Sequence, residues 1–364
     1  MRESFVIYLE LQILTKKQNT MKRFLSACLV ILTLLPLAAK GPKKDLSYFW
    51  RDKDGLINAQ TEFVLEHVSD LLEADKPTPG EPSMLRKSAL YLLDQIFHDT
   101  RLDGSPIVSA FLDKRMESVL ASLAKPQKEG VTVYKLYNDG WIIRTPKVTI
   151  GWDIYRGRDV NGAERRLMSD SIARALVNEC DILFLTHNHP DHVDPFVVDC
   201  FVAQNKPVIA TDEILPDNKG VTHFRKPVIT ETQFKAANGA KLKATVVPGH
   251  QDELQNNIYV VTTPDGYTVC STGDQWLKSD QEMVLNLQGK IPEVDVLLPI
   301  CWAAKLPELC RSFGAKLVLT GHENELGHHT IDHREAYWLS MYKLEDVTVP
   351  SALLTWGESI HYAH

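Results

Sequence analysis

The spacing of apolar side chains changes once along this chain, from a helical period to a strand period. Between about Leu46 and Lys125, apolar residues recur three and four positions apart, as in an amphipathic helix. The segment Asp75–Pro82 holds three prolines and a glycine, so we expect it to separate the first two helices. The pattern predicts three or four helices that pack on the following domain. Their predicted apolar faces are Phe63, Val64, Val68, Leu71 and Leu72; Leu85, Ala89, Leu92, Leu93, Ile96 and Phe97; and Val108, Phe111, Leu112, Met116, Val119, Leu120 and Leu123.

Short β-rich runs replace the helical period from Val131 onward. Asn138-Asp139-Gly140 and Pro146 separate the first three runs, which indicates a β-meander. A helix is predicted around Asp170–Val177. Strands in runs, with helices between only some of them, favour an α+β fold of two packed sheets with helices outside, rather than a doubly wound sheet. The predicted strands are Val131–Tyr137, Trp141–Arg144, Val148–Trp152, Ile182–Leu185, Pro207–Ala210, Lys243–Val247, Ile258–Thr263, Tyr267–Ser271, Val294–Pro299 and Lys316–Thr320.

The first 39 residues have the layout of a targeting segment. Met21-Lys22-Arg23 is a short basic start, Phe24–Leu37 is an apolar run, and the small pair Ala38-Ala39 follows. This order is typical of a secretory signal peptide, and the run is too short for a comfortable membrane span. We predict that translation starts at Met21, that residues 1–39 are absent from the mature protein, and that the protein is periplasmic or secreted. The alternative is a buried N-terminal helix.

Composition and charge narrow the functional classes. The chain has 364 residues and a formal net charge of −7, which becomes −10 when residues 1–39, with five basic and two acidic residues, are removed. An acidic protein without a Lys/Arg tract repels phosphate backbones, so we expect no nucleic-acid partner. Five cysteines remain, without a CxxC pair, which excludes a disulfide framework and a zinc ribbon. Cys301 and Cys310 are compatible with either a bridge or two free thiols.

The strongest chemical signal is a histidine-rich segment directly after the strand Ile182–Leu185. It reads Thr186-His187-Asn188-His189-Pro190-Asp191-His192. Residues two apart in an extended segment point to the same side, so His187 and His189 can bind one cation. Asp191 and His192 then face a second position. Packing gives no reason for three imidazoles and a carboxylate at the end of a buried strand, because each is costly to bury without a partner.

Three later strands end in the same way, each with a small or turn residue and then a ligand-type side chain. Lys243–Val247 runs into Pro248-Gly249-His250, Tyr267–Ser271 into Thr272-Gly273-Asp274, and Lys316–Thr320 into Gly321-His322. Glycine lets the backbone bend so that the next side chain points across the strand ends. Any one of these is more simply a turn residue, but four such endings together predict a metal centre.

This HxHxDH segment, followed by His, Asp and His at strand ends, resembles the metallo-β-lactamase superfamily. The resemblance covers about Val131 to His364 and implies a four-layer αβ/βα sandwich with metals at one edge of the two sheets. We therefore divide the chain into the leader at 1–39, a helical segment at 40–127 and a catalytic domain at 128–364. Carried over residue by residue, the resemblance implies that His187, His189 and His250 hold one metal, that Asp191, His192 and His322 hold the other, that Asp274 bridges them, and that Asp153 supports a ligand histidine or caps a turn.

The resemblance also implies a two-metal hydrolase mechanism. Two divalent cations about 3.5–4 Å apart lower the pKa of a bridging water, and the resulting hydroxide attacks a carbonyl or phosphoryl group. Asp191 or a nearby histidine then brings a proton to the leaving group. We predict His329, in the run Glu323–His329 that also holds His328, as a second catalytic residue. A solvent-exposed histidine pair is the alternative. Zinc is the expected metal, and manganese or iron suits the same donors.

Within the superfamily the chain resembles the group that contains ascorbate-6-phosphate lactonase and N-acyl phosphatidylethanolamine phospholipase D. That implies an ester, lactone or phosphodiester substrate, either a small molecule or a lipid. Asp274 argues against the β-lactamases with a cysteine ligand, and His189 argues against the diiron oxygen reductases. The absence of a basic arm from the sequence argues against the ribonucleases. The non-enzymatic alternative is a periplasmic metal-binding or scaffold protein that keeps the hydrolase fold.

Overall fold

The computed structural model describes residues 52–158, 166–275, 277–328 and 334–364. Residues 57–364 form one compact unit, separate from residues 1–56. The predicted leader at 1–39 lies outside the described residues. Within the described residues, no helix is both long and apolar enough to span a membrane.

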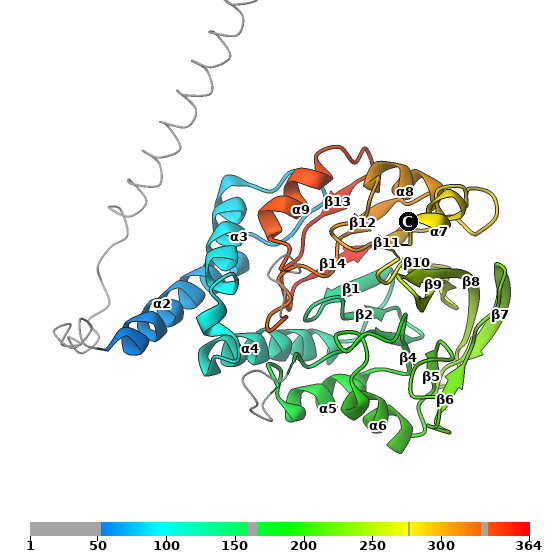
Figure 1. Cartoon of the computed structure of the whole chain (residues 1–364), viewed down its shortest axis with the longest axis horizontal. Helices are drawn as coiled ribbons and strands as arrows, with labels where there is room; N and C mark the ends of the chain where they lie inside the picture. Colours follow the sequence, from blue (N-terminus) through cyan, green and yellow to red (C-terminus); the bar gives the residue numbers. More distant parts are fainter. Residues whose placement is uncertain (1–51, 159–165, 276, 329–333) are drawn as a thin grey trace, which may run out of the picture. The chain divides into compact units, whose positions relative to one another are not determined.

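Two seven-stranded mixed sheets form the centre of the unit (Figure 1). In the first sheet, β3 to β6 are parallel, and in the second, β10 to β13 are parallel. The first sheet has the order β14 (Ser359–Tyr362), β1 (Val131–Lys135), β2 (Trp141–Arg144), β3 (Thr149–Trp152), β4 (Ile182–Phe184), β5 (Val208–Ala210), β6 (Val221–His223). The second has the order β13 (Ser351–Ala352), β12 (Leu317–Leu319), β11 (Val296–Leu298), β10 (Thr268–Ser271), β9 (Leu254–Thr262), β8 (Lys241–Gln251), β7 (Thr230–Lys235).

Three separate hydrophobic cores show that the elements form four layers. Strand β4 is apolar throughout because it is buried on both faces. Ile182 and Phe184 join the core between the two sheets, whereas Leu183 joins the core beneath the helices. Strand β11 repeats the pattern, with Leu298 in the inter-sheet core and Leu297 in a third core on the outer face of its sheet. The predicted four-layer sandwich is therefore confirmed.

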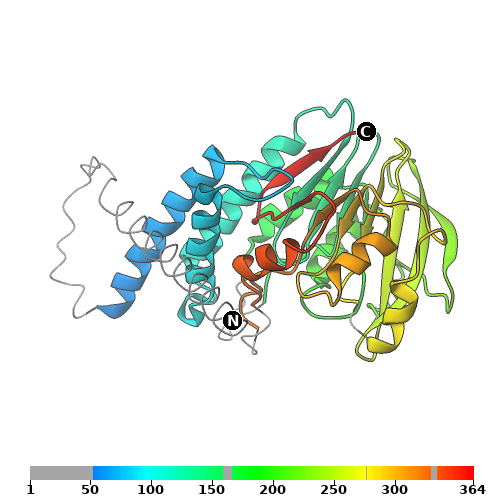
Figure 2. The ribbon, with the colours of Figure 1, turned by 90° about the horizontal axis from the view of Figure 1, so that it is seen from above.

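Helices cover the outer face of each sheet (Figure 2). The N-terminal helices begin at serine caps, where the Ser83 hydroxyl accepts from the Arg86 N–H and the Ser105 hydroxyl from the Ile107 N–H. The helices that pack on the first sheet are α2 (Lys53–Ala74), α3 (Met84–Phe97), α4 (Pro106–Leu123), α5 (Asp170–Glu179), α6 (Pro195–Ala203) and α9 (Tyr337–Leu344), with the short 3₁₀ helix η2 (Thr100–Leu102). On the second sheet lie α7 (Lys278–Val284) and α8 (Leu306–Ser312).

Most predicted elements are present, with two local differences. The three N-terminal helices are observed, but Phe63, Leu85 and Leu92, placed on apolar faces, are exposed. The strand predicted at Lys243–Val247 continues as β8 to Gln251, because residues 248–251 pair with the antiparallel strand β9. The described cysteines, Cys301 and Cys310 among them, are free and buried.

Candidate metal centre

Six of the seven predicted ligands meet at one edge of the two sheets. They follow β4 in the first sheet and β10 and β12 in the second. Strands β4 and β12 run parallel to both of their neighbours, and β10 runs parallel to β11. The carboxyl ends of parallel strands are where ligands gather in layered α/β folds. Residues up to 135 positions apart are thereby brought together. The six are His187, His189, Asp191, His192, Asp274 and His322.

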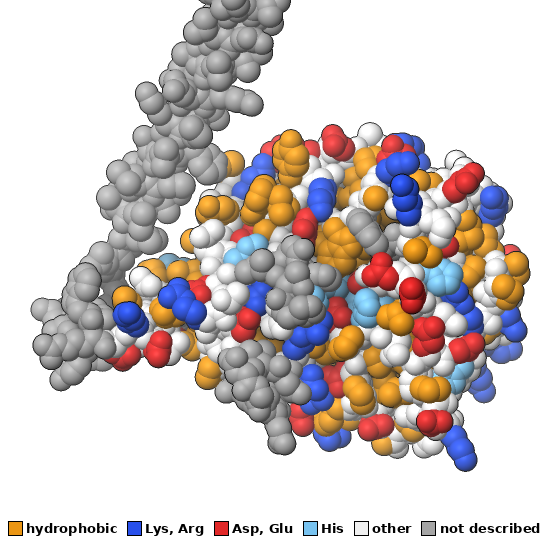
Figure 3. All heavy atoms as spheres, in the orientation of Figure 1, with side chains coloured by type: hydrophobic (Ala, Val, Ile, Leu, Met, Phe, Trp, Pro, Cys, Tyr) orange, Lys and Arg blue, Asp and Glu red, His pale blue; other side chains and the backbone are white. Residues whose placement is uncertain are grey.

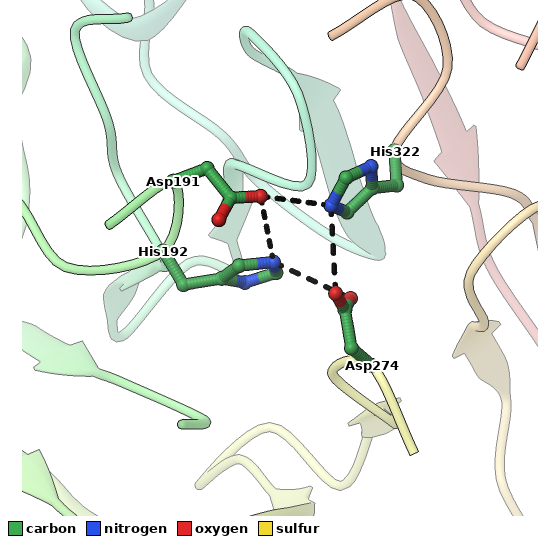
Figure 4. Close-up of side chains that lie close together, drawn as sticks. All are labelled: Asp191, His192, Asp274 and His322. Carbon is green, nitrogen blue, oxygen red and sulfur yellow. Dashed lines mark hydrogen bonds and ion pairs between the residues drawn. The ribbon is translucent and has the colours of Figure 1, made fainter. Parts of the chain in front are cut away.

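Four buried side chains form the larger of two clusters, which we call the four-residue group: Asp191, His192, Asp274 and His322 (Figure 4). The Nε2 atom of His322 lies 2.9 Å from Asp191 Oδ2 and 3.5 Å from Asp274 Oδ2. The Nε2 atom of His192 lies 3.5 Å from Asp191 Oδ2 and 3.3 Å from Asp274 Oδ1. Two imidazole nitrogens and two carboxylates thus point at one common position.

The second cluster, the three-residue group, consists of His187, His189 and Asp274. His187 Nε2 lies 3.0 Å from His189 Nδ1 and 3.7 Å from Asp274 Oδ2. Because Asp274 belongs to both groups, its two oxygens stand between the two positions. Asp274 is the residue to which the resemblance assigns the bridging role.

His250 is the one predicted ligand that the structure does not bring into either group. It lies within the β8–β9 hairpin, and its Nδ1 is 2.9 Å from Asp280 Oδ2. Its Nε2 is 3.1 Å from a terminal guanidinium nitrogen of Arg225, so it accepts a hydrogen bond from that arginine. Its side chain is 34% exposed, unlike the buried histidines of the four-residue group. The three-residue group therefore has one donor fewer than the resemblance implies.

The backbone before two of the ligands has a shape that only glycine permits. Gly273 has φ +51°, and a Cβ there would lie 2.6 Å from the Cβ of Thr186. At Gly321, a Cβ would lie 1.8 Å from Asp139 Oδ1. His322 itself has φ 72°, the left-handed region that a histidine occupies only at a cost. Close packing at both positions, together with the positive φ of Gly273, thus explains the glycines before Asp274 and His322.

Asp153 follows β3 and holds two residues of the histidine segment. Its Oδ2 lies 3.0 Å from His192 Nδ1, and its two oxygens accept from the backbone N–H and the hydroxyl of Thr186. An imidazole that donates from Nδ1 to a carboxylate keeps Nε2 as the free ligand atom. Asp153 is therefore placed to orient His192.

The predicted meander turn contributes two further residues, which the sequence analysis did not assign to the site. Asn138 Nδ2 donates to Asp191 Oδ2 at 3.1 Å, and Asp139 Oδ1 accepts from the indole N–H of Trp141. Asp139 also forms a possible ligand group with Asp153 and His192. Burial raises the pKa of Asp139 to about 7. Asn138-Asp139-Gly140 is the sequence of an ordinary exposed turn. Only the burial of this turn in the structure marks it as part of the site.

A buried ion pair lies next to this turn. Lys135 and Glu323 have no exposed side-chain surface, and their charged atoms are 3.3 Å apart. The Lys135 ammonium also sits 4.3 Å from the centroid of the Trp141 ring. Because Glu323 directly follows His322, the pair fixes the backbone that carries this ligand. The run Glu323–Glu325, which is irregular in structure, is entirely buried.

The two pairs of histidines have opposite electrostatic character. Burial lowers the pKa of His187 well below its ordinary value, with His192 adding to the effect, and burial also lowers the pKa of His189. Burial acts in the same direction on His322, but Asp274 and Asp191 outweigh it and raise its pKa to about 9. Asp274 and Asp191 likewise raise the pKa of His192 well above its usual range.

The side chains present fit divalent metal ions. The donors are imidazole nitrogens and carboxylate oxygens, which suit zinc, manganese and iron. His192 Nε2 and Asp274 Oδ1 are buried and have no hydrogen-bond partner among the described residues. Such atoms are costly to bury unless another group satisfies them. A cation between the two carboxylates would satisfy both atoms.

The predicted catalytic residue His329 lies outside the described residues. Its neighbour His328 is partly buried, and Gly327 lines a cavity beside His189.

The indole of Trp302 packs edge-on against the His322 ring, with 4.3 Å between their centroids. The sequence analysis did not assign Trp302 to the site.

Comparison with known proteins gave matches among solved structures only. No protein-family model and no curated protein matches the sequence. A metallo hydrolase, Igni18, from Ignicoccus hospitalis has 16% identity and a TM-score of 0.48, covering 64% of this chain and 99% of its own. An isothiocyanate hydrolase from Delia radicum gut bacteria has 18% identity and a TM-score of 0.45, with 64% and 99% coverage. CmlA, a diiron β-hydroxylase from Streptomyces venezuelae, has 11% identity and a TM-score of 0.44, with 66% and 55% coverage.

Proposed function

We propose that this chain is an exported metal-dependent hydrolase with two cations in the site. The four-residue group would hold one cation and the three-residue group the other, with Asp274 between them. Zinc is our first choice of metal, with manganese or iron as alternatives. The substrate would be an ester, lactone or phosphodiester of a small molecule or lipid. Export rests on the signal-peptide pattern of residues 21–39.

One observation carries the proposal. Four ligand-type side chains from three loops of two different sheets converge, fully buried, with one donor atom of each within 4.8 Å of the others. Burying two carboxylates together is unfavourable unless a positive charge balances them, and a cation held by all four side chains would supply it. When bound, the cations would supply a nucleophile from water near neutral pH and polarise the bond to be broken.

The chain's own residues position and protonate the reactants. Asp153 fixes the tautomer of His192, and Asn138 fixes Asp191 through the 3.1 Å hydrogen bond. The Oδ2 atom of Asp191 faces His322 and His192, whereas its Oδ1 faces Arg158 at 3.7 Å. We assign Asp191 Oδ1 to carry the proton to the leaving group, because it is the oxygen that does not face the two histidines.

The test is metal content together with hydrolysis. Purified protein is stripped of metal, reloaded with Zn²⁺ or Mn²⁺, and assayed with bis-p-nitrophenyl phosphate and a panel of lactones. We expect about two metal ions per chain by elemental analysis and turnover that depends on the metal. Stoichiometric binding without turnover under any metal would instead support the scaffold alternative. No stoichiometric binding would refute the proposal.

A further inference from the structure

A cavity of about 650 Å³ opens beside the three-residue group. His189 forms part of its wall, so the cavity reaches the proposed reaction centre. The volume is in the range of pockets that hold small organic molecules. Residues that line it include Tyr155, Arg158, Arg166, Val193 and Leu215.

Two guanidinium groups give one side of the cavity a positive character. The Nε of Arg158 donates to Glu325 Oε1 at 2.6 Å, and one of its terminal nitrogens lies 3.7 Å from Asp191 Oδ1. Glu325 is fully buried, so it anchors the arginine in place while 21% of the Arg158 side chain stays exposed. A guanidinium carries five N–H donors in a rigid fork, more than these two contacts use. Arg166 is tied to the same wall through the Gly157 carbonyl at 2.9 Å.

Tyr155 adds a neutral donor to the same wall. Its side chain is 1% exposed, and its hydroxyl has no hydrogen-bond partner within the described part of the chain. A buried hydroxyl without a partner is unfavourable and usually marks a place where a ligand or water binds. Burial raises the pKa of Tyr155, so the hydroxyl keeps its proton and can donate to an anion.

Among the described residues that line the cavity, one is acidic. Asp194 lines it, but both of its carboxylate oxygens accept hydrogen bonds from Arg156. Val193, Pro195 and Leu215 supply apolar surface. Figure 3 shows one face of the molecule, where Lys and Arg side chains lie among acidic and histidine side chains.

We infer that this cavity binds the acidic head and apolar body of an organic anion, and so sets the substrate class of the proposed hydrolase. A carboxylate or phosphate would accept from Arg158 and Tyr155, and an alkyl or aryl body would lie against Val193 and Leu215. Through its contact with Asp191, Arg158 links anion recognition to the reaction centre. The inference rests on the proposed function only in calling the ligand a substrate. Binding itself can be measured without turnover.

The test is calorimetric titration of the purified protein with three matched probes: 4-phenylbutyrate, 4-phenylbutylphosphonate and the neutral 4-phenylbutan-1-ol. Each is titrated into metal-free and zinc-loaded protein. We expect at least one acid to bind about tenfold more tightly than the alcohol in both forms, since charge-assisted hydrogen bonds are worth about that much. Whichever acid binds more tightly identifies the head group.

Three variants locate the effect. Arg158→Gln should remove the preference for the acid, and Tyr155→Phe should weaken acid binding about threefold while leaving alcohol binding unchanged. The matched control Arg311→Gln removes an exposed arginine on α8, over the other sheet, and should keep the preference. If circular dichroism shows that Arg158→Gln is not folded, the effect of Tyr155→Phe on acid binding decides whether the cavity binds the anion.

Two results would overturn the inference. One is equal binding of acids and alcohol to metal-free protein. The other is an acid preference that appears only with zinc and survives both Arg158→Gln and Tyr155→Phe, since the metals alone would then hold the acid. A preference in metal-free protein without any metal-dependent turnover would leave the anion site standing and refute the hydrolase.

Discussion

The two ligand groups share Asp274 but differ in how firmly the fold holds them. The four-residue group draws on three loops, and its side chains are almost fully buried. Asn138, Asp153 and the Lys135–Glu323 pair support it from behind. The three-residue group takes both of its histidines from a single segment, and His189 is only partly buried. Its expected fourth member, His250, is held by Asp280 and Arg225 instead.

This difference indicates an order of affinity. A site with four preorganised donors binds a cation more tightly than one with three, because less ordering remains to be done on binding. Exposure on the side of His189 also gives a substrate in the adjoining cavity access to that position. The four-residue group would then be the permanent site and the three-residue group the exchangeable one. The following predictions test this contrast, from the largest effect to the smallest.

The largest effect is expected from Asp274→Ala, because this residue belongs to both groups. We expect both cations to be lost and hydrolysis to fall by about 10³-fold or more. Elemental analysis and the phosphodiester assay measure the two effects. Asp295→Ala is the matched control, since Asp295 is equally buried but accepts from Thr268 N–H at the opposite end of the second sheet. Unchanged activity in Asp274→Ala would refute its assigned role.

The next largest effect separates the two groups directly. His322→Ala removes a donor of the four-residue group alone and should lower its metal affinity and the activity by about 100-fold. His250→Ala should leave the tightly bound cation in place and cost less activity, because His250 is outside both groups. Titration with a zinc-sensitive dye measures both affinities. Equal losses in the two variants would show that His250 ligates a metal as strongly as His322.

A smaller effect is expected from Asp153→Asn. The amide is a poor acceptor for the Nδ1 proton of His192, so the orientation and basicity of this ligand suffer. We expect metal affinity of the four-residue group to fall by about tenfold while the fold is kept. Asp181→Asn, which alters a carboxylate that accepts from Thr149 N–H at the other end of β3 and β4, is the control. Similar affinities in the two variants would contradict the role of Asp153.

The smallest effect on metal binding and activity is expected from Asp94, which acts on stability behind the four-residue group. Asp94 accepts hydrogen bonds from Asn324, Tyr337 N–H and Trp338 N–H, and it thereby joins α3 to α9 and to the segment after His322. Burial raises its pKa from 3.8 to about 6. The folded state therefore keeps a proton on Asp94 that the unfolded chain releases above about pH 4.

The stability that Asp94 contributes to the folded state should therefore fall as the pH rises. The stabilising contribution is fully present below about pH 4 and is lost as pH rises through about 6, by up to about 3 kcal/mol. Asp94→Asn cannot titrate, so the difference in unfolding free energy between wild type and variant should fall between pH 4 and 6 and stay constant above 7. Urea unfolding at a series of pH values measures it. A difference that is flat over the whole range would contradict the expected pKa.

The sequence determined the parts of the site that depend on local geometry. In the 187–192 segment, spacing alone brings ligand types together, and Gly273 and Gly321 mark bends that their neighbours make necessary. The burial of β4 and β11 on both faces also follows from their apolar composition. Whether the assigned residues bind metal, and whether residues 1–39 are a leader, stay predictions.

Only the tertiary structure decided which strand ends meet. The local sequences of β4, β10 and β12 do not indicate that the ends of these strands lie at one edge of the two sheets. That arrangement depends on the strand order in each sheet and on how the two whole sheets pack. The same holds for Asp139 and Arg158, whose sequence neighbours are those of ordinary turns, and which join the site through contacts with residues more than 30 positions away. His250 shows the converse, since its motif resembled the others but pairing with β9 carried the strand past it. Sequence spacing fixes which side chains are neighbours within a segment, whereas long-range packing fixes which segments face one another, and this site depends on both.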